Sequence, residues 1–93
     1  MSFGVETKRA YSLETARRLL QKPDDFCLIL WDYLLPDGNS CELIKETRTK
    51  FGKKPMIASS SRVLTRKLQI QAGCNYELDF QESAAEMFKK LLA

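Results

Sequence analysis

One stretch of the sequence decides the fold, and it reads Phe26-Cys27-Leu28-Ile29-Leu30-Trp31-Asp32-Tyr33-Leu34-Leu35-Pro36-Asp37-Gly38. Its first six residues are apolar at every position, and the run ends abruptly at Asp32. A strand that is apolar on both faces is typical of a parallel sheet covered by helices. Residues 36–38 have the chemistry of a turn. The stretch therefore predicts a buried strand over 26–31 that ends at a carboxylate and a loop.

The residues before this strand predict a short strand and a helix. Residues 5–10 alternate in a polar-rich pattern, which suits a strand at the edge of a sheet. Ser12 can cap a helix over residues 13–22, which Pro23 ends. Four apolar residues at helical spacing are expected to face inward, namely Leu13, Ala16, Leu19 and Leu20.

The residues after the loop predict further alternation of helices and strands. The expected elements are a helix over 40–51, a strand over 55–59, a helix over 62–72, a strand over 76–80 and a helix that begins at Ser83. Asn39 with Glu42, and Ser83 with Glu86, have the spacing of capping boxes. The residues expected to face inward are Leu43, Ile44, Phe51, Val63, Leu64, Leu68, Ala72, Ala84, Met87, Phe88, Leu91 and Leu92.

The resulting order is β-α-β-α-β-α-β-α. Strict alternation predicts an α/β fold with a parallel sheet, flanking helices and right-handed crossovers. We expect residues 1–93 to form a single domain of this kind. Because ligands of such folds bind at the carboxyl ends of the strands, Asp32 and Ser60 are the candidate site residues.

Composition excludes several classes of function. The chain has no histidine, which rules out a Ser-His-Asp or Cys-His catalytic pair. Cys27, Cys41 and Cys74 are too widely spaced for a zinc site, so we expect three reduced thiols that serve mainly in packing. The longest apolar run is too short to span a bilayer. The first six residues do not have the pattern of a signal peptide, so a cytoplasmic location is expected.

The net charge of +3 is mildly basic. Most basic residues lie beside acids or at helical spacing, which favours a solvated surface over a nucleic-acid interface. A weaker alternative is an α/β domain that binds nucleic acid through Arg62, Arg66 and Lys67 of one helix.

Three segments resemble the receiver domains of two-component response regulators. Residues 28–38 are similar to the strand and loop that carry the phosphoacceptor aspartate of that family. Residues 55–61 are similar to the strand that ends in Ser or Thr, and residues 71–75 to the Ala-Gly-Ala turn before the last strand. These blocks occur in order over about residues 5–92. The resemblance implies a flavodoxin-like receiver fold.

The resemblance also implies roles for individual residues. Asp32 matches the phosphoacceptor, Ser60 matches the hydroxyl that senses the phosphoryl group, and Leu34 matches the position whose backbone carbonyl helps to hold Mg²⁺. A carboxylate can accept a phosphoryl group when a hard cation neutralises the charge on the incoming oxygens. Two plainer interpretations stay open, in which Asp32 caps the loop over 36–38 and Ser60 is a helix N-cap.

The chain departs from the receiver pattern in three places. The segment before the phosphoacceptor strand matches the family's second strand and helix, so the first strand, the first helix and the acidic pair that binds Mg²⁺ are absent. Phe80-Gln81 stands where the family has Lys-Pro, and Ser40 replaces a glycine. Each lost electrostatic contact is worth about 2–4 kcal/mol of transition-state stabilisation. We therefore expect a non-enzymatic pseudo-receiver without a cofactor. The alternative is an active receiver that is phosphorylated on Asp32 with Mg²⁺.

The missing strand leaves a gap in the expected sheet, because the family's first strand lies between its second and third. Unpaired buried backbone groups are costly, so the gap must be filled. Either residues 5–10 move inward and pair with residues 26–31, or a second copy of the chain closes the sheet by strand addition or exchange. The missing helix would also uncover apolar surface. We therefore expect a homodimer or a tight complex with a protein partner, such as a histidine kinase or another regulatory protein.

Overall fold

The computed structural model describes residues 8–22, 25–78, 86, 89 and 91. Its elements are α1 (Leu13–Leu19), β1 (Ile29–Trp31), β2 (Leu34–Leu35), β3 (Gly38–Asn39), α2 (Cys41–Phe51), β4 (Met56–Ala58), α3 (Val63–Ala72) and β5 (Tyr76–Glu77). The predicted elements over residues 5–7 and from residue 79 onward lie outside the described residues, apart from isolated positions. None of the helices in the described part of the chain has the length and apolar character of a membrane span.

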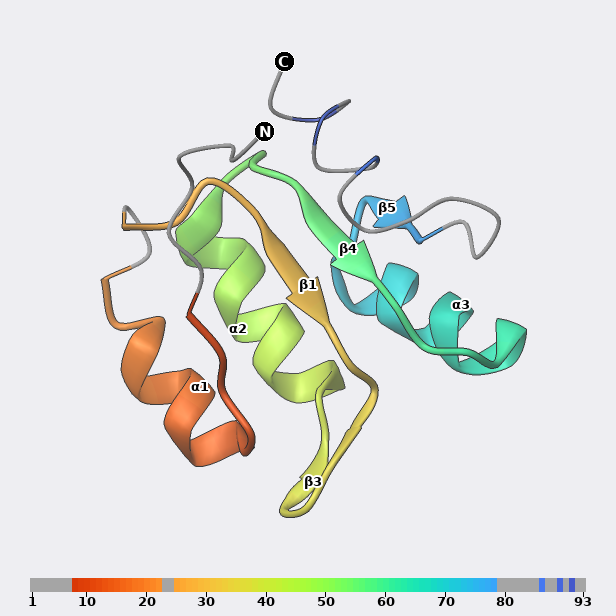
Figure 1. Ribbon diagram of the computed structural model, residues 1–93, viewed down its shortest axis with the longest axis horizontal. Coiled ribbons are helices and arrows are strands. Elements are labelled where there is room, and N and C mark those ends of the chain that lie inside the picture. The colour runs from red at the N-terminus through yellow and green to blue at the C-terminus, as the bar shows by residue number, and fades with distance from the viewer. Residues whose placement is uncertain (1–7, 23–24, 79–85, 87–88, 90, 92–93) are drawn as a thin grey trace.

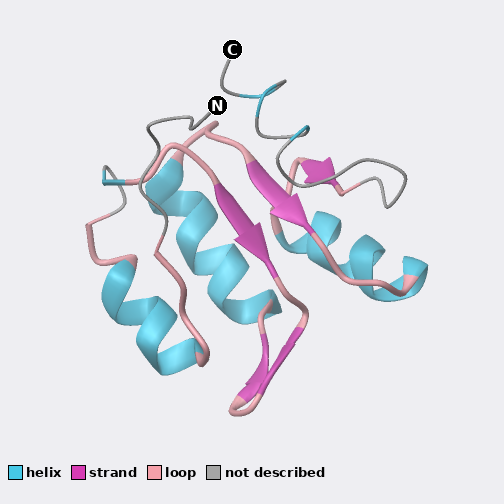
Figure 2. Cartoon of the chain, in the orientation of Figure 1, coloured by secondary structure: helices cyan, strands magenta, loops and turns pink. Residues whose placement is uncertain are grey.

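A parallel sheet of three strands forms the centre of the described structure, in the order β1-β4-β5 (Figures 1 and 2). Leu30 lies opposite Ile57, which in turn lies opposite Tyr76. The loop between β1 and α2 is a small antiparallel hairpin of β2 and β3, which is turned by Pro36 and Asp37. The predicted α/β class with a parallel sheet and helices is confirmed, and the architecture is compatible with a flavodoxin-like fold.

The core lies between one face of this sheet and the helices. Trp31, Met56 and Ala58 of the sheet are buried in one cluster with apolar residues of the helices and the α3–β5 connection, which are Ala16, Leu43, Ile44, Phe51, Ala72 and Cys74. Met56 and Ala58 alternate along β4, and Ile57 between them is also fully buried, so β4 is covered on both of its faces. Leu30 points to the opposite face and is 40% exposed.

Helix α1 is shorter than predicted, because it ends at Leu19 rather than at residue 22. Its start agrees with the prediction, since the Ser12 hydroxyl accepts a hydrogen bond of 3.1 Å from the Thr15 N–H. The hairpin of β2 and β3 stabilises the start of this helix. Leu13 N–H donates to Asp37 Oδ1 at 2.8 Å, and Glu14 N–H donates to Asp37 Oδ2 at 3.2 Å.

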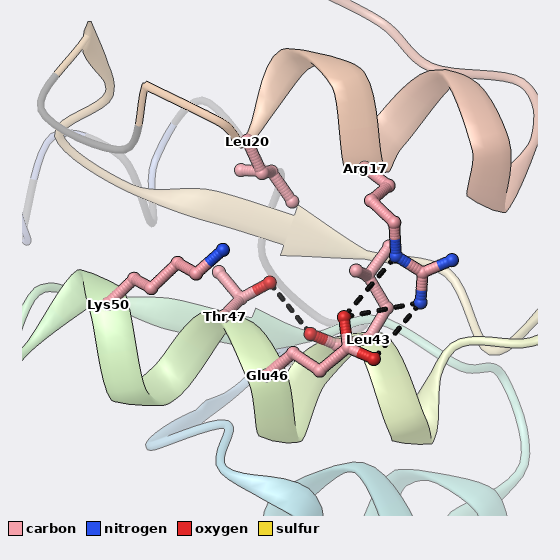
Figure 3. A pocket seen from close by; sticks show the side chains of 6 residues that line it. All are labelled: Arg17, Leu20, Leu43, Glu46, Thr47 and Lys50. Carbon is pink, nitrogen blue, oxygen red and sulfur yellow. Dashed lines mark hydrogen bonds and ion pairs between the residues drawn. The ribbon is translucent and has the colours of Figure 1, made fainter.

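Helices α1 and α2 lie side by side and are joined by an ion pair (Figure 3). The Arg17 guanidinium reaches both carboxylate oxygens of Glu46, at 3.1 and 3.2 Å from Nη2. Leu20 and Leu43 lie beside this pair. Both charged side chains are about half exposed, so the pair contributes little net free energy to the packing of the two helices.

The start of α2 differs from the predicted capping box. Ser40 is the N-cap residue and makes no side-chain cap bond to the helix. The Asn39 side chain instead accepts a hydrogen bond of 3.1 Å from the Cys41 N–H, and Glu42 pairs with Lys45. The cap therefore forms within the end of the hairpin, because β3 runs directly into the helix. The predicted stop at Gly52 is confirmed, with a φ of 68°.

The prediction for the buried side of α3 is wrong. Three apolar side chains expected inside are exposed, and Val63, Leu64 and Leu68 have exposed fractions of 54%, 75% and 44%. Of the four predicted inward residues, Ala72 alone is buried, and its neighbour in the buried face is Gln69. The helix has this rotation because the Gln69 amide finds hydrogen-bond partners at the end of the sheet.

Candidate functional site

The site predicted from the sequence lies where β1 and β4 end. The two strands are adjacent and parallel, so the residues that follow them lie together. Ser59 Oγ donates a hydrogen bond of 2.7 Å to the Trp31 carbonyl, and it lies 3.2 Å from Asp32 Oδ1. A hydroxyl has a single proton, so it donates to one of these oxygens at a time. Asp32 is exposed, and the described hydrogen-bond partner of its carboxylate is Ser59.

Ser60, the residue predicted from the resemblance, turns away from Asp32. Its hydroxyl hydrogen-bonds the hydroxyl of Thr65 in α3, and the Arg62 N–H approaches it at 3.4 Å. The N-cap residue of α3 is Arg62, so the interpretation of Ser60 as the N-cap is wrong. Three successive serines follow β4, and the sequence offers no signal to show which of them would reach the aspartate.

A fully buried glutamine closes this end of the sheet, and sequence analysis missed it. Gln69 Nε2 donates to the Trp31 carbonyl at 2.9 Å, and Gln69 Oε1 accepts from the Ser60 N–H at 3.3 Å. The Trp31 carbonyl also accepts from the Ser59 N–H at 3.1 Å. The space at the ends of β1 and β4 is therefore bridged by side chains of the protein itself. The sequence gives no local signal for this burial, because the neighbours Leu68 and Ile70 are themselves exposed.

The loop next to Asp32 is fixed by Ser40. The buried Ser40 hydroxyl donates a hydrogen bond of 2.6 Å to the backbone carbonyl of Asp32, and the Ser40 N–H donates to Tyr33 O at 2.8 Å. The described contact of the Asp32 carboxylate runs to Ser59 and not to the loop, so the idea that this carboxylate caps residues 36–38 is wrong. Leu34 lies on the hairpin, opposite Asn39, and its side chain is 74% exposed.

The receiver resemblance implies that the Asp32 carboxylate and the Leu34 carbonyl are ligands of Mg²⁺. Mg²⁺ requires octahedral coordination by oxygen atoms, usually from one or two carboxylates and several waters. Among the residues that the structure describes, no three His, Cys, Asp or Glu side chains gather closely enough to hold a metal ion.

The three cysteines are free, as expected from their spacing. Cys74 is buried in the core cluster, and burial raises the pKa of its thiol to about 12. Burial also raises the pKa of Cys41. A thiol with a raised pKa is a poor nucleophile at neutral pH, so these two residues have a packing role.

No protein-family model matches this chain, and no curated protein matches it significantly. The likeness to receiver domains accordingly depends on the three sequence segments described above.

Proposed function

We propose that this protein is a non-catalytic, receiver-like signalling module that acts in the cytoplasm by binding another protein. The observation that carries the proposal is the outer face of α3. The side chains of residues 63, 64, 67, 68 and 71 lie on one side of the helix, and all five are exposed. We call this face the α3 surface, and three of its five residues are apolar: Val63, Leu64 and Leu68.

The charge of the α3 surface indicates the kind of partner. Lys67 belongs to the surface and Arg62 precedes it, whereas α3 carries no acidic residue. An apolar face with basic groups is complementary to an apolar face with acidic groups. A second copy of the chain would bring like charges together here. The partner proposed is therefore a different protein with acidic side chains around an apolar centre, such as a histidine kinase or another regulatory protein.

The site at the ends of β1 and β4 supports a role without catalysis. Phosphoryl transfer depends on positioned groups that stabilise developing charge. Here the hydroxyls and the amide that surround the strand ends are engaged with the protein itself. Ser60 bonds Thr65, and Gln69 bonds the Trp31 carbonyl. Asp32 is left with Ser59 as its described hydrogen-bond partner.

Nucleic-acid binding receives less support than protein binding. Of the three basic residues considered, Arg66 is largely committed within the protein. Its Nη1 donates to Ser60 O at 2.9 Å, and its Nε lies 3.5 Å from Glu77 Oε1. Arg62 and Lys67 alone make a small positive surface that is interrupted by apolar side chains.

The binding role is tested by cross-linking in the native cells. A photo-cross-linking amino acid is placed at position 68, and the covalent adducts are identified by mass spectrometry. We expect a discrete protein adduct that Leu64→Glu abolishes and Leu34→Glu leaves unchanged. Leu34 is the matched control, because its exposure of 74% equals that of Leu64 within one percent. Adducts that respond equally to both substitutions would count against the α3 surface.

The absence of phosphoryl transfer is tested separately. The purified protein is incubated with Mg²⁺ and acetyl phosphate, and its mass is measured beside that of Asp32→Asn. We expect no phosphoryl adduct on either protein. A mass gain that requires Asp32 would overturn the non-catalytic part of the proposal and establish the active receiver instead.

A further inference from the structure

The outer edge of β1 carries backbone groups that point away from the sheet. Ile29 N–H donates to Pro55 O at 3.1 Å, and Trp31 O accepts from Ser59 N–H at 3.1 Å, so both residues turn toward β4. Successive residues of a strand turn to opposite edges, and Leu30 therefore directs its N–H and C=O the other way. Among the described residues, β1 is the outermost strand on this side. Residues 8–10, the described part of the predicted first strand, are irregular.

Helix α1 lies beyond this edge and forms an apolar floor beside it. Figure 1 shows α1 next to α2, on the side of α2 away from α3. In the same view α1 lies past β1, on the side of β1 away from β4 (Figure 1). Its inner side carries Ala16, which is buried, with Leu13 and Leu20 packed against the core. A segment laid along β1 would have the apolar side of α1, where Ala10 also packs against the core, on one face. On its other face it would adjoin Leu30, which is 40% exposed although its neighbour Ile57 in β4 is fully buried.

The outward backbone groups of Leu30 and the apolar side of α1 favour one extended segment as the binding partner of this edge. A helix cannot bond to alternate edge groups, whereas an extended backbone can. A second copy of the chain does not fit through its own β1. Pairing two β1 strands about a two-fold axis keeps the helices of both copies on the same side of the joined sheet. Strands are about 4.8 Å apart and packed helices about 8–10 Å apart, so α1 of each copy would overlap α2 of the other.

The two ends of β1 differ in charge, which adds to the description of the occupant. The Lys54 ammonium donates to Phe26 O at 3.2 Å, before the strand begins. The exposed Asp32 carboxylate follows its end. Residues 26–31 between them are uncharged. We infer that the outer edge of β1 is a docking site for one extended apolar segment of a partner protein, with an acidic end beside Lys54 and a basic end beside Asp32. This inference does not depend on the α3 surface.

The probe for this site is the blocked peptide Glu-Val-Ile-Val-Ile-Val-Lys. Its charges suit a strand parallel to β1, and the reversed peptide Lys-Val-Ile-Val-Ile-Val-Glu suits an antiparallel strand. Binding is followed by NMR and by hydrogen exchange of the Leu30 amide. We expect one of the two peptides to bind and to slow that exchange at least about tenfold, because the amide gains a hydrogen bond. The same peptide methylated on alternate amide nitrogens is expected not to bind.

Substitutions at Leu30 provide a second arm. Leu30→Pro removes the outward N–H but leaves the bonds of Ile29 and Trp31 to β4, and proline is tolerated on edge strands. It should abolish peptide binding, whereas Leu30→Ala should retain it. If Leu30→Pro fails to fold, the methylated peptides decide the matter alone.

Several results would overturn the inference. The first two are equal binding of methylated and unmethylated peptides, and binding of neither peptide. The third is a free protein in which the Leu30 amide is already protected from exchange. The fourth is a stable dimer, seen by light scattering, that Leu30→Pro dissociates. Loss of the cross-link at position 68 in Leu64→Glu leaves the inference unaffected, so the two proposals fail independently.

Discussion

The Gln69 side-chain amide donates a hydrogen bond of 2.9 Å to the Trp31 carbonyl, and thereby attaches α3 to the end of β1. The other atom of the same amide accepts from the Ser60 N–H, beyond the end of β4. These bonds set the rotation of α3 about its axis. They place Gln69 inside, and they leave Leu64 and Leu68 outside. The closed strand-end site and the exposed α3 surface are therefore two consequences of one buried residue.

Replacement of Gln69 by leucine should destabilise the protein although leucine is the more apolar residue. The substitution leaves the partly buried Ser60 N–H without its described acceptor and removes one donor to Trp31 O. We expect a loss of about 1–3 kcal/mol in the free energy of unfolding, measured by urea denaturation. Gln71→Leu is the control, because it makes the same change at an exposed position of the same helix. Equal effects of the two substitutions would show that the Gln69 bonds do not matter.

The Asp37 carboxylate should make stability depend on pH in the acid range. Hydrogen bonds from the Leu13 N–H, and secondarily from the Glu14 N–H, lower the pKa of Asp37 below its usual 3.8. The ionised form therefore stabilises the folded state above pH 3.8, and this contribution disappears as the pH falls through the lower folded-state pKa. We expect urea denaturation to show this loss in the wild type and a smaller one in Asp37→Asn.

A second carboxylate serves as the control for this titration. Asp25→Asn removes the same charge at an exposed position away from the start of α1. It should retain the wild-type loss of stability in acid. If both substitutions flatten the pH dependence equally, the effect belongs to net charge and not to the bond between the hairpin and α1.

The sequence predicted the elements whose signals are local. The Ser12 cap and the stop at Gly52 each act within a few residues, and both occur where predicted. The apolar run before Asp32 correctly indicated a strand of a parallel sheet. The β1 strand begins only at Ile29, because Asp25 to Leu28 form a bent connection that the apolar pattern could not distinguish from a strand.

The parts that could not be predicted depend on partners far along the chain. The Asp37 carboxylate caps a helix that starts 24 residues earlier. Gln69 lies inside because of a carbonyl 38 residues away. Helical spacing alone predicted that Leu64 and Leu68 are buried, because spacing carries no information about the two hydrogen-bond partners of the Gln69 amide. Likewise, the choice of Ser59 over Ser60 at Asp32 depends on how β4 leaves the sheet.

Alanine should be tolerated much less well at Gly73 than at Gly52. Both glycines have positive φ, at 143° and 68°, where a side chain is strained. At Gly73 an added Cβ would also lie 3.0 Å from Arg48 Cβ, whereas at Gly52 it would meet no atom within 4 Å. We expect Gly52→Ala to cost about 1–2 kcal/mol from backbone strain and Gly73→Ala to cost clearly more. Thermal denaturation of both variants measures the difference.

The contact at Gly73 explains why the difference should be large. Arg48 Nε donates to Gly73 O at 2.8 Å, and Arg48 Nη1 donates to Lys54 O at 2.9 Å. A methyl group at Gly73 would push this guanidinium away from both carbonyls and separate α2 from α3. Equal melting temperatures for the two variants would mean that the Arg48 side chain moves aside without loss.

Alkylation of the cysteines should follow their burial. Cys27 is exposed, Cys41 is partly buried and Cys74 is buried with a pKa raised to about 12. At neutral pH the reactive thiolate of Cys74 is therefore scarce, and the reagent cannot reach it in the folded protein. We expect iodoacetamide to modify Cys27 first and Cys74 last, as followed by peptide mass spectrometry. In urea the three rates should converge, and in Cys27→Ser the fast phase should vanish. Because Cys74 is buried in the core and follows α3 directly in the chain, its slow modification also reports how often this end of α3 leaves the core. Gln69→Leu should accelerate the modification of Cys74 but not that of Cys27, and equal acceleration at both thiols would indicate global unfolding rather than release of α3.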